Sequence, residues 1–106
     1  MGLFTRRPYD VSNLNSAERA AAQAALEVAQ MLDTRGTMKK ELNGALKGLR
    51  KGKMTRSELA TTAACLVASL ASLAGSEDPD RSSMLNQKKV ATVAMAMALD
   101  KLKAKL

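Results

Sequence analysis

The chain has 106 residues, a formal net charge of +7, a single cysteine and no histidine. This length indicates one small domain with a modest core, which oligomerisation would help to stabilise. One cysteine excludes a disulfide within the chain and indicates a reducing, cytoplasmic compartment. Without histidine, a phosphate-binding loop or paired carboxylates, the chain is predicted not to be an enzyme and to need neither a metal nor another cofactor.

The expected architecture is all-α, a small bundle of four helices, with residues 1–12 as a polar N-terminal arm and residues 13–106 as a single helical domain. The first helix is expected over residues 16–34. Asn15 can cap its start, and Glu18 completes a variant of the capping box. Helical spacing predicts that its core stripe consists of Ala17, Ala21, Ala24, Ala25, Val28 and Leu32.

The second helix is expected over residues 38–51, with Thr37 as its N-cap. It contains Gly44 and Gly48 in a GxxxG spacing, and each glycine costs a helix about 0.8–1 kcal/mol relative to alanine. Glycines allow another backbone to approach closely. The pair therefore predicts a close contact, made either with a neighbouring helix or with a phosphate chain.

The third helix is expected over residues 56–74, because Thr55 and Glu58 form a capping box at its start. No charged residue occurs from position 59 to position 76. A helix that is apolar nearly all round is a buried helix, so this one is predicted to be the central helix of the bundle. Its threonine, serine and alanine content argues against a membrane span.

The fourth helix is expected over residues 79–105, and Asp78, Pro79 and Asp80 are interpreted as its capping residues rather than as a cation site. Residues 90–99 are again apolar all round. One bundle of this size cannot bury both sides of two such helices, so the sequence predicts a homodimer. The residues expected at its interface are Val90, Met95 and Met97. The C-terminal Ala104-Lys105-Leu106 resembles a peroxisomal signal, which leaves targeting to that organelle as a minor alternative.

The excess positive charge of the chain lies in one segment, residues 35–56. Eight basic residues and one acid, Glu41, give this segment a net charge of +7, and the other nine basic residues balance the other nine acids. A basic helix face of this length matches several phosphates along a nucleic acid. The residues predicted to bind nucleic acid are Arg35, Lys39, Lys40, Asn43, Lys47, Arg50, Lys51, Lys53 and Arg56.

The predicted function is non-enzymatic binding of the phosphate backbone of a duplex, without sequence readout. No zinc-finger spacing, RNP pattern or basic zipper is present, and Phe4 and Tyr9 are the only aromatic residues that could stack on bases. Double-stranded RNA is favoured over DNA, because proteins read it mainly by shape. A small, basic, all-helical dimer of this kind resembles the RNA-silencing suppressors of insect nodaviruses in character and size, a resemblance that no motif carries.

The alternative is a small viral, phage or accessory adaptor or inhibitor, whose basic helix docks onto an acidic protein partner. Local charge alone does not separate these two interpretations, since both need an exposed basic face. The salt dependence of binding separates them. Binding to nucleic acid weakens steeply as the salt concentration rises, whatever the base sequence.

Overall fold

The computed structural model describes the backbone of residues 9–75 and 82–106, and the side chains of residues 9–73 and 89–106. The described residues form an all-α architecture, as predicted, with the helices α1 (Ser16–Leu32), α2 (Lys39–Lys51), α3 (Arg56–Gly75) and α4 (Ser82–Lys103). The predicted caps at Asp78, Pro79 and Asp80 lie outside the described residues. No described helix is long and apolar enough to cross a membrane.

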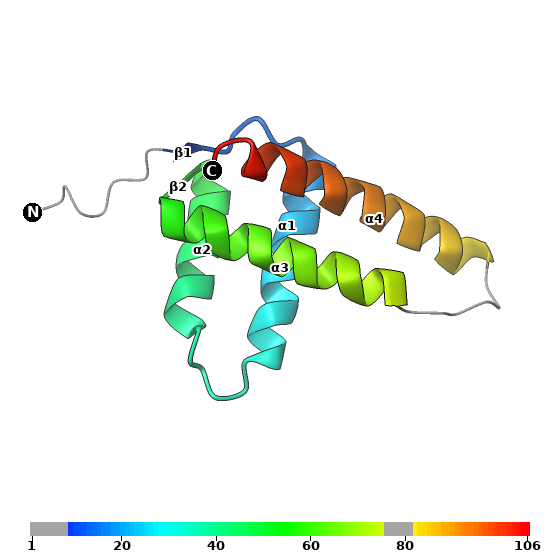
Figure 1. Ribbon diagram of the computed structural model, residues 1–106, viewed down its shortest axis with the longest axis horizontal. Helices are drawn as coiled ribbons and strands as arrows, with labels where there is room; N and C mark the ends of the chain where they lie inside the picture. Colours follow the sequence, from blue (N-terminus) through cyan, green and yellow to red (C-terminus); the bar gives the residue numbers. More distant parts are fainter. Residues whose placement is uncertain (1–8, 76–81) are drawn as a thin grey trace, which may run out of the picture.

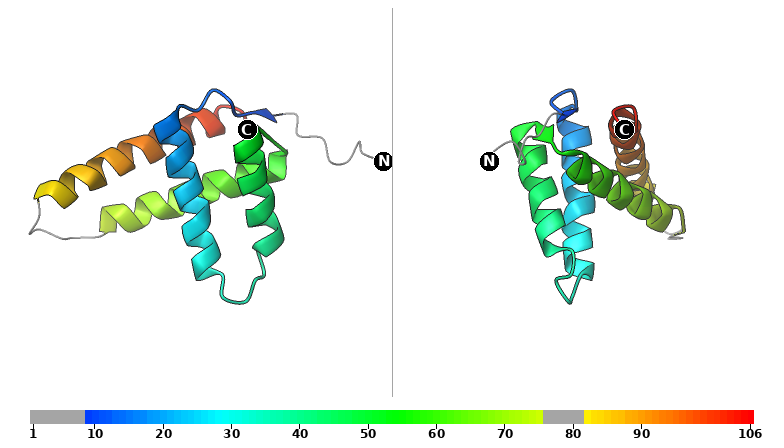
Figure 2. Two further views of the ribbon diagram at one scale, coloured as in Figure 1. Left: turned by 180° about the vertical axis from the view of Figure 1, so that it is seen from behind. Right: turned by 60° about the vertical axis from the view of Figure 1, so that its left-hand side comes forward.

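The helices are arranged as two antiparallel hairpins that cross each other. Helices α1 and α2 form the first hairpin, and α3 and α4 form the second, which lies across it (Figure 1). The C-terminal half of α3 and the N-terminal half of α4, here called the far halves of these helices, project beyond α1, as the view from behind also shows (Figure 2). The core lies where the hairpins cross, and its largest fully buried aliphatic side chains are Leu26, Leu42, Met54, Leu59, Leu66 and Leu102.

Two short strands, which the sequence analysis did not predict, join the N-terminal segment to the α2–α3 connection. They are β1 (Tyr9–Asp10) and β2 (Lys53–Met54), and they pair antiparallel. Val11 follows β1 directly and is only 1% exposed, as a member of the hydrophobic core. Residues 9–11 therefore belong to the folded domain, and the boundary predicted at residue 12 for the polar arm is wrong.

Two of the predicted helix starts are confirmed in atomic detail. Asn15 Oδ1 accepts a hydrogen bond from the backbone N–H of Glu18, and Glu18 Oε1 accepts one from the N–H of Asn15, both at 2.8 Å. Thr55 and Glu58 form the same reciprocal pair at the start of α3, at 3.1 and 2.9 Å. Both boxes satisfy backbone N–H groups that have no partner within the helix.

Thr37 was predicted to cap the start of α2, and this prediction is wrong. The N-cap of α2 is Met38, which makes no side-chain capping hydrogen bond, and Asp33 in the turn between α1 and α2 takes over that role. Its carboxylate accepts hydrogen bonds from the backbone N–H groups of Thr37 and Met38, at 3.1 and 2.8 Å. Helix α1 accordingly ends at Leu32, before the predicted residue 34. Gly36, with φ +70°, lies within this turn.

The predicted core stripe of α1 is correct for only two of its six residues. Ala21 and Ala25 are buried, but Ala17, Ala24, Val28 and Leu32 are exposed. The buried face is rotated toward Glu18, Ala22 and Leu26. An alanine-rich helix has two apolar faces of similar character, so periodicity alone did not decide which of them meets the core.

Candidate nucleic-acid interface

Helix α2 separates its apolar and basic residues onto opposite faces. Its buried residues are Leu42, Ala45, Gly48 and Leu49. At 3.6 residues per turn, the basic residues fall within an arc of about 120° on the opposite side. This arc contains Lys39, Lys40, Lys47, Arg50 and Lys51. The hydrophobic contacts of one face therefore hold the other face toward solvent.

All eight basic residues between positions 35 and 56 are exposed. None of them makes an ion pair within the described part of the chain, where the single ion pair joins Lys101 and Glu18. Within this part of the chain, the charge of the segment is thus not paired with carboxylates at ion-pair distance, although Asp10 lies near enough to Lys53 for a weaker electrostatic interaction. Such cationic groups are free to exchange their counterions for phosphates.

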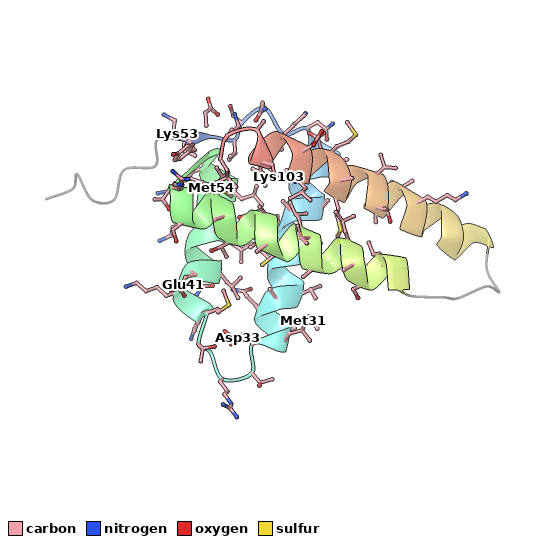
Figure 3. All side chains as sticks on the ribbon, in the orientation of Figure 1. Met31, Asp33, Glu41, Lys53, Met54 and Lys103 are labelled. Atoms are coloured by element: carbon pink, nitrogen blue, oxygen red, sulfur yellow. The ribbon has the colours of Figure 1, made fainter. Side chains whose placement is uncertain are left out.

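The remaining basic residues of the segment extend the basic face beyond both ends of α2. Arg35 lies in the α1–α2 turn beside Asp33, whereas Lys53 lies on β2 and Arg56 begins α3. Figure 3 shows these two ends, with Asp33 labelled at the turn and Lys53 at the β1–β2 end. The predicted binding residues therefore extend from the α1–α2 turn, along α2, to the start of α3.

The β1–β2 end also contains a lysine that the sequence analysis did not include. The pKa of Asp10 lies below its usual value because the side chain of Ser12 donates a hydrogen bond to it, as does the backbone N–H of Ser12, and Lys105 and Lys53 add a smaller electrostatic contribution. Lys105 is thus close enough to Asp10 to act on it. It lies 52 positions after Lys53 in the chain, and no local pattern connects the two.

Asn43 has a structural partner, unlike the basic residues around it. Its Oδ1 accepts a hydrogen bond of 2.6 Å from Nε2 of Gln30, which joins α2 to α1. Asn43 and Gln30 also line a polar pocket of about 190 Å³ with Lys39 and Asp33. The carboxylate of Asp33 makes this pocket unfavourable for a phosphate, so the exposed lysines outside it are the better candidates.

Gly44 and Gly48 make the predicted close approach, and they make it to the protein's own chain. A Cβ atom on Gly48 would lie 2.8 Å from the carbonyl oxygen of Lys53 and 3.0 Å from Oε1 of Glu58. On Gly44 it would lie 3.0 Å from Oε2 of Glu58. Of the two alternatives left open by the sequence, this geometry fits packing against the start of α3 and not contact with a phosphate chain.

The three residues predicted for a dimer interface have different surroundings. Val90 is 66% exposed and Met97 is 47% exposed, so both are available to a partner. Met95 is only 9% exposed and belongs to the hydrophobic core. Met95 therefore offers a partner much less of its side chain than Val90 and Met97 do, because positions 95 and 97 point in different directions on a helix and position 95 meets the crossing point of the hairpins.

In the described ranges, no three histidine, cysteine, aspartate or glutamate side chains gather where they could hold a metal ion. Cys65 is half-buried, and burial raises the pKa of its thiol. Comparisons of the chain with models of known protein families, with curated proteins and with solved structures found no match. The candidate interface therefore depends on its geometry and charge alone.

Proposed function

We propose that this protein is a non-enzymatic nucleic-acid-binding protein, which grips the phosphate backbone of a duplex along the basic face of α2. The observation that carries the proposal is a set of eight exposed basic residues, on a helix and its two flanks, that make no ion pair with the described residues. The rest of the chain is electrically balanced. A localised positive charge of this size is the electrostatic footprint of a nucleic-acid surface.

The geometry favours contact with phosphates over contact with bases. Helix α2 has 13 residues, and its length of about 20 Å at 1.5 Å per residue spans several phosphates. Lys40, Lys47 and Lys51 lie near one line along this face. Stacking on single-stranded bases needs aromatic side chains, and the described residues offer only Tyr9, half-buried in β1.

Helix α3 is a poor candidate for a recognition helix in a helix-turn-helix. It follows α2 closely, but Leu59, Thr62 and Leu66 are fully buried in the core. Its exposed residues beyond Glu58 are alanine, valine and serine, which cannot form the bidentate hydrogen bonds that read base edges. Recognition by shape and backbone is therefore proposed, with duplex RNA ahead of duplex DNA.

A gel-shift panel tests this proposal with duplex RNA, duplex DNA and the corresponding single strands. We expect the wild type to bind duplexes of unrelated sequence with similar affinity, and to lose this affinity steeply as salt rises. The double variant Lys47→Glu and Lys51→Glu should abolish binding and keep its helical circular dichroism. The same charge change elsewhere, Lys103→Glu on α4 with Arg19→Glu on α1, is the matched control.

Two results would overturn the proposal. If the wild type binds no nucleic acid at low salt, the alternative is favoured, in which the basic face binds an acidic protein. Undiminished duplex binding by the double variant would exclude this face of α2, whatever else binds.

A further inference from the structure

Three apolar grooves follow one another over α1, α3 and α4. Two of them, of about 330 and 480 Å³, lie between α1 and α4 and share Ala17, Val90 and Ala94 in their lining. The third, of about 630 Å³, adds α3 and shares Ala91 and Met95 with the second. The grooves therefore form one continuous surface, which we call the apolar corner. It includes the place where the far halves of α3 and α4 project beyond α1 (Figures 1 and 2).

The apolar corner contains almost no charge. Its lining includes none of the eight basic residues of the α2 segment, and among the described residues its charged members are Glu18 and Lys89, both in the first groove. Six large apolar side chains of the lining stay at least 46% exposed, namely Val28, Leu32, Met38, Val90, Val93 and Met97. A monomeric protein rarely leaves a contiguous apolar patch of this extent open to water.

The flank of α1 in this corner is apolar, yet the described part of the chain does not cover it. Ala17, Ala24, Val28 and Leu32 repeat at helical spacing and are exposed. The solvated face of α1, with Arg19, Gln23 and Glu27, is a separate face of the helix. Helix α1 thus has two apolar faces and one polar face, and only the first apolar face meets the core.

We propose that a second copy of this chain covers the apolar corner, and that the protein is a twofold dimer in which each copy places its α1 flank against the corner of the other. The size of the surface fits this occupant. The three grooves are lined by 26 different residues, and a standard interface uses about 20–30 residues from each partner. A twofold interface requires one self-complementary surface, and the corner offers an apolar helix flank beside an apolar trough.

The charge distribution also selects a second copy over other occupants. Two copies of net charge +7 would repel each other if they met through their basic segments, but the corner excludes those residues from the contact. An acidic protein would be attracted to α2 and not to this surface. This inference does not depend on the proposed binding of nucleic acid.

Sedimentation equilibrium tests the proposal at micromolar concentration. The wild type should have twice the chain mass of 11.3 kDa. Val28→Glu and Val90→Glu should each reduce this to the mass of one chain, because each places a charge in the contact while altering a side chain that is exposed in the single copy. Gln23→Glu, on the polar face of α1, introduces the same residue and should remain dimeric. A monomeric wild type would overturn the proposal and leave the corner to a different partner.

The thiol of Cys65 provides a second readout, which needs no variant. Cys65 lines the third groove and has no disulfide partner, so a second copy on this groove would shield it. The rate of its alkylation by a maleimide should fall as the concentration of wild-type protein rises through the dimerisation range. An unchanged rate in a range where sedimentation shows a dimer would assign the dimer to another surface and overturn the proposal.

Discussion

The Nζ atom of Lys101, near the end of α4, lies 2.7 Å from Oε1 of Glu18 in the first turn of α1. Glu18 is only 1% exposed, and the same Oε1 accepts the capping hydrogen bond from the N–H of Asn15. Lys101 also donates a hydrogen bond of 3.1 Å to the carbonyl oxygen of Asn13. Lys101 therefore joins the last helix to Glu18 in the first turn of α1, 83 positions earlier, and to the backbone just before the N-cap of that helix.

This ion pair makes folding sensitive to acid. The pKa of Glu18 lies below its usual value of 4.5, first because of the hydrogen bond from Lys101 and then because of the N–H of Asn15, with burial opposing both. A carboxyl group whose pKa is lowered by folding stabilises the folded state above its unfolded pKa. That stabilisation is lost as the pH falls below 4.5 and through the folded pKa.

We expect denaturant unfolding of the wild type to show this loss. Lys101→Met should be less stable than the wild type at neutral pH, because it leaves a buried carboxylate without its partner. Its stability should also fall less between neutral pH and the acid range. Lys103→Met removes an exposed lysine from the same helix and should keep the wild-type profile. Identical acid profiles for the two variants would contradict the role assigned to Lys101.

Gly48→Ala is expected to destabilise the protein. Alanine improves helix propensity by up to about 1 kcal/mol. However, its Cβ would lie 2.8 Å from a backbone oxygen, that of Lys53, which cannot move without disturbing β2. Overpacking of this kind costs about 1–3 kcal/mol, so we expect a net loss of up to about 2 kcal/mol in the free energy of unfolding.

Gly44→Ala is the matched control for Gly48→Ala. Its nearest contact would be Oε2 of Glu58, the end of a flexible side chain, at 3.0 Å. We therefore expect a smaller change in thermal and denaturant unfolding than for Gly48→Ala. A Gly48→Ala variant more stable than the wild type would show that this glycine has no packing role.

Asp33 rather than Thr37 is expected to set the start of α2. Asp33→Ala removes the acceptor for two backbone N–H groups, those of Thr37 and Met38, and should cost about 1 kcal/mol, as the loss of a capping side chain does. Thr37→Ala leaves both bonds in place and loses only the hydroxyl bond to Asp33, so its effect should stay within about 0.5 kcal/mol. If urea unfolding shows that the two variants lose the same free energy of unfolding, Thr37 contributes as much as Asp33 to the start of α2.

A single neutralised lysine should change the salt dependence of nucleic-acid binding. If Lys47 contacts a phosphate, Lys47→Gln weakens binding to all sequences alike and lowers the slope of log affinity against log salt by about one unit. Arg19→Gln lowers the net charge equally but alters the polar face of α1, so its slope should match that of the wild type. Filter binding over a salt series measures both slopes, and a shared decrease would mean that only the total charge matters.

Local sequence signals predicted the helices, two of their starts and the basic face. The capping boxes at Asn15 and Thr55 depend on residues three positions apart, and the basic face of α2 follows from the helical period. These features need no knowledge of the rest of the chain. Gly52 likewise ends α2 in a left-handed conformation, with φ +81°, where the sequence analysis ended the helix.

The sequence analysis missed features that depend on contacts between distant segments of the chain. These are the pairing of β1 with β2, the burial of Met95 in the core and the position of Lys105 beside Asp10. The turn residue Asp33 was missed for a different reason. Its carboxylate reaches four and five residues ahead, which is longer than the spacing of a standard cap.

By itself, the sequence determined four helices and an uncompensated charge of +7 on residues 35–56, because helix formation and net charge are set by neighbouring residues and by the helical period. Only the tertiary structure decided which apolar face of α1 meets the core and which one lines the apolar corner. Alanine-rich faces differ little in hydrophobicity, so the crossing of the two hairpins makes that choice through packing. In the same packed arrangement, Gly48 lies against the backbone of Lys53 and the lysines of α2 are exposed to solvent.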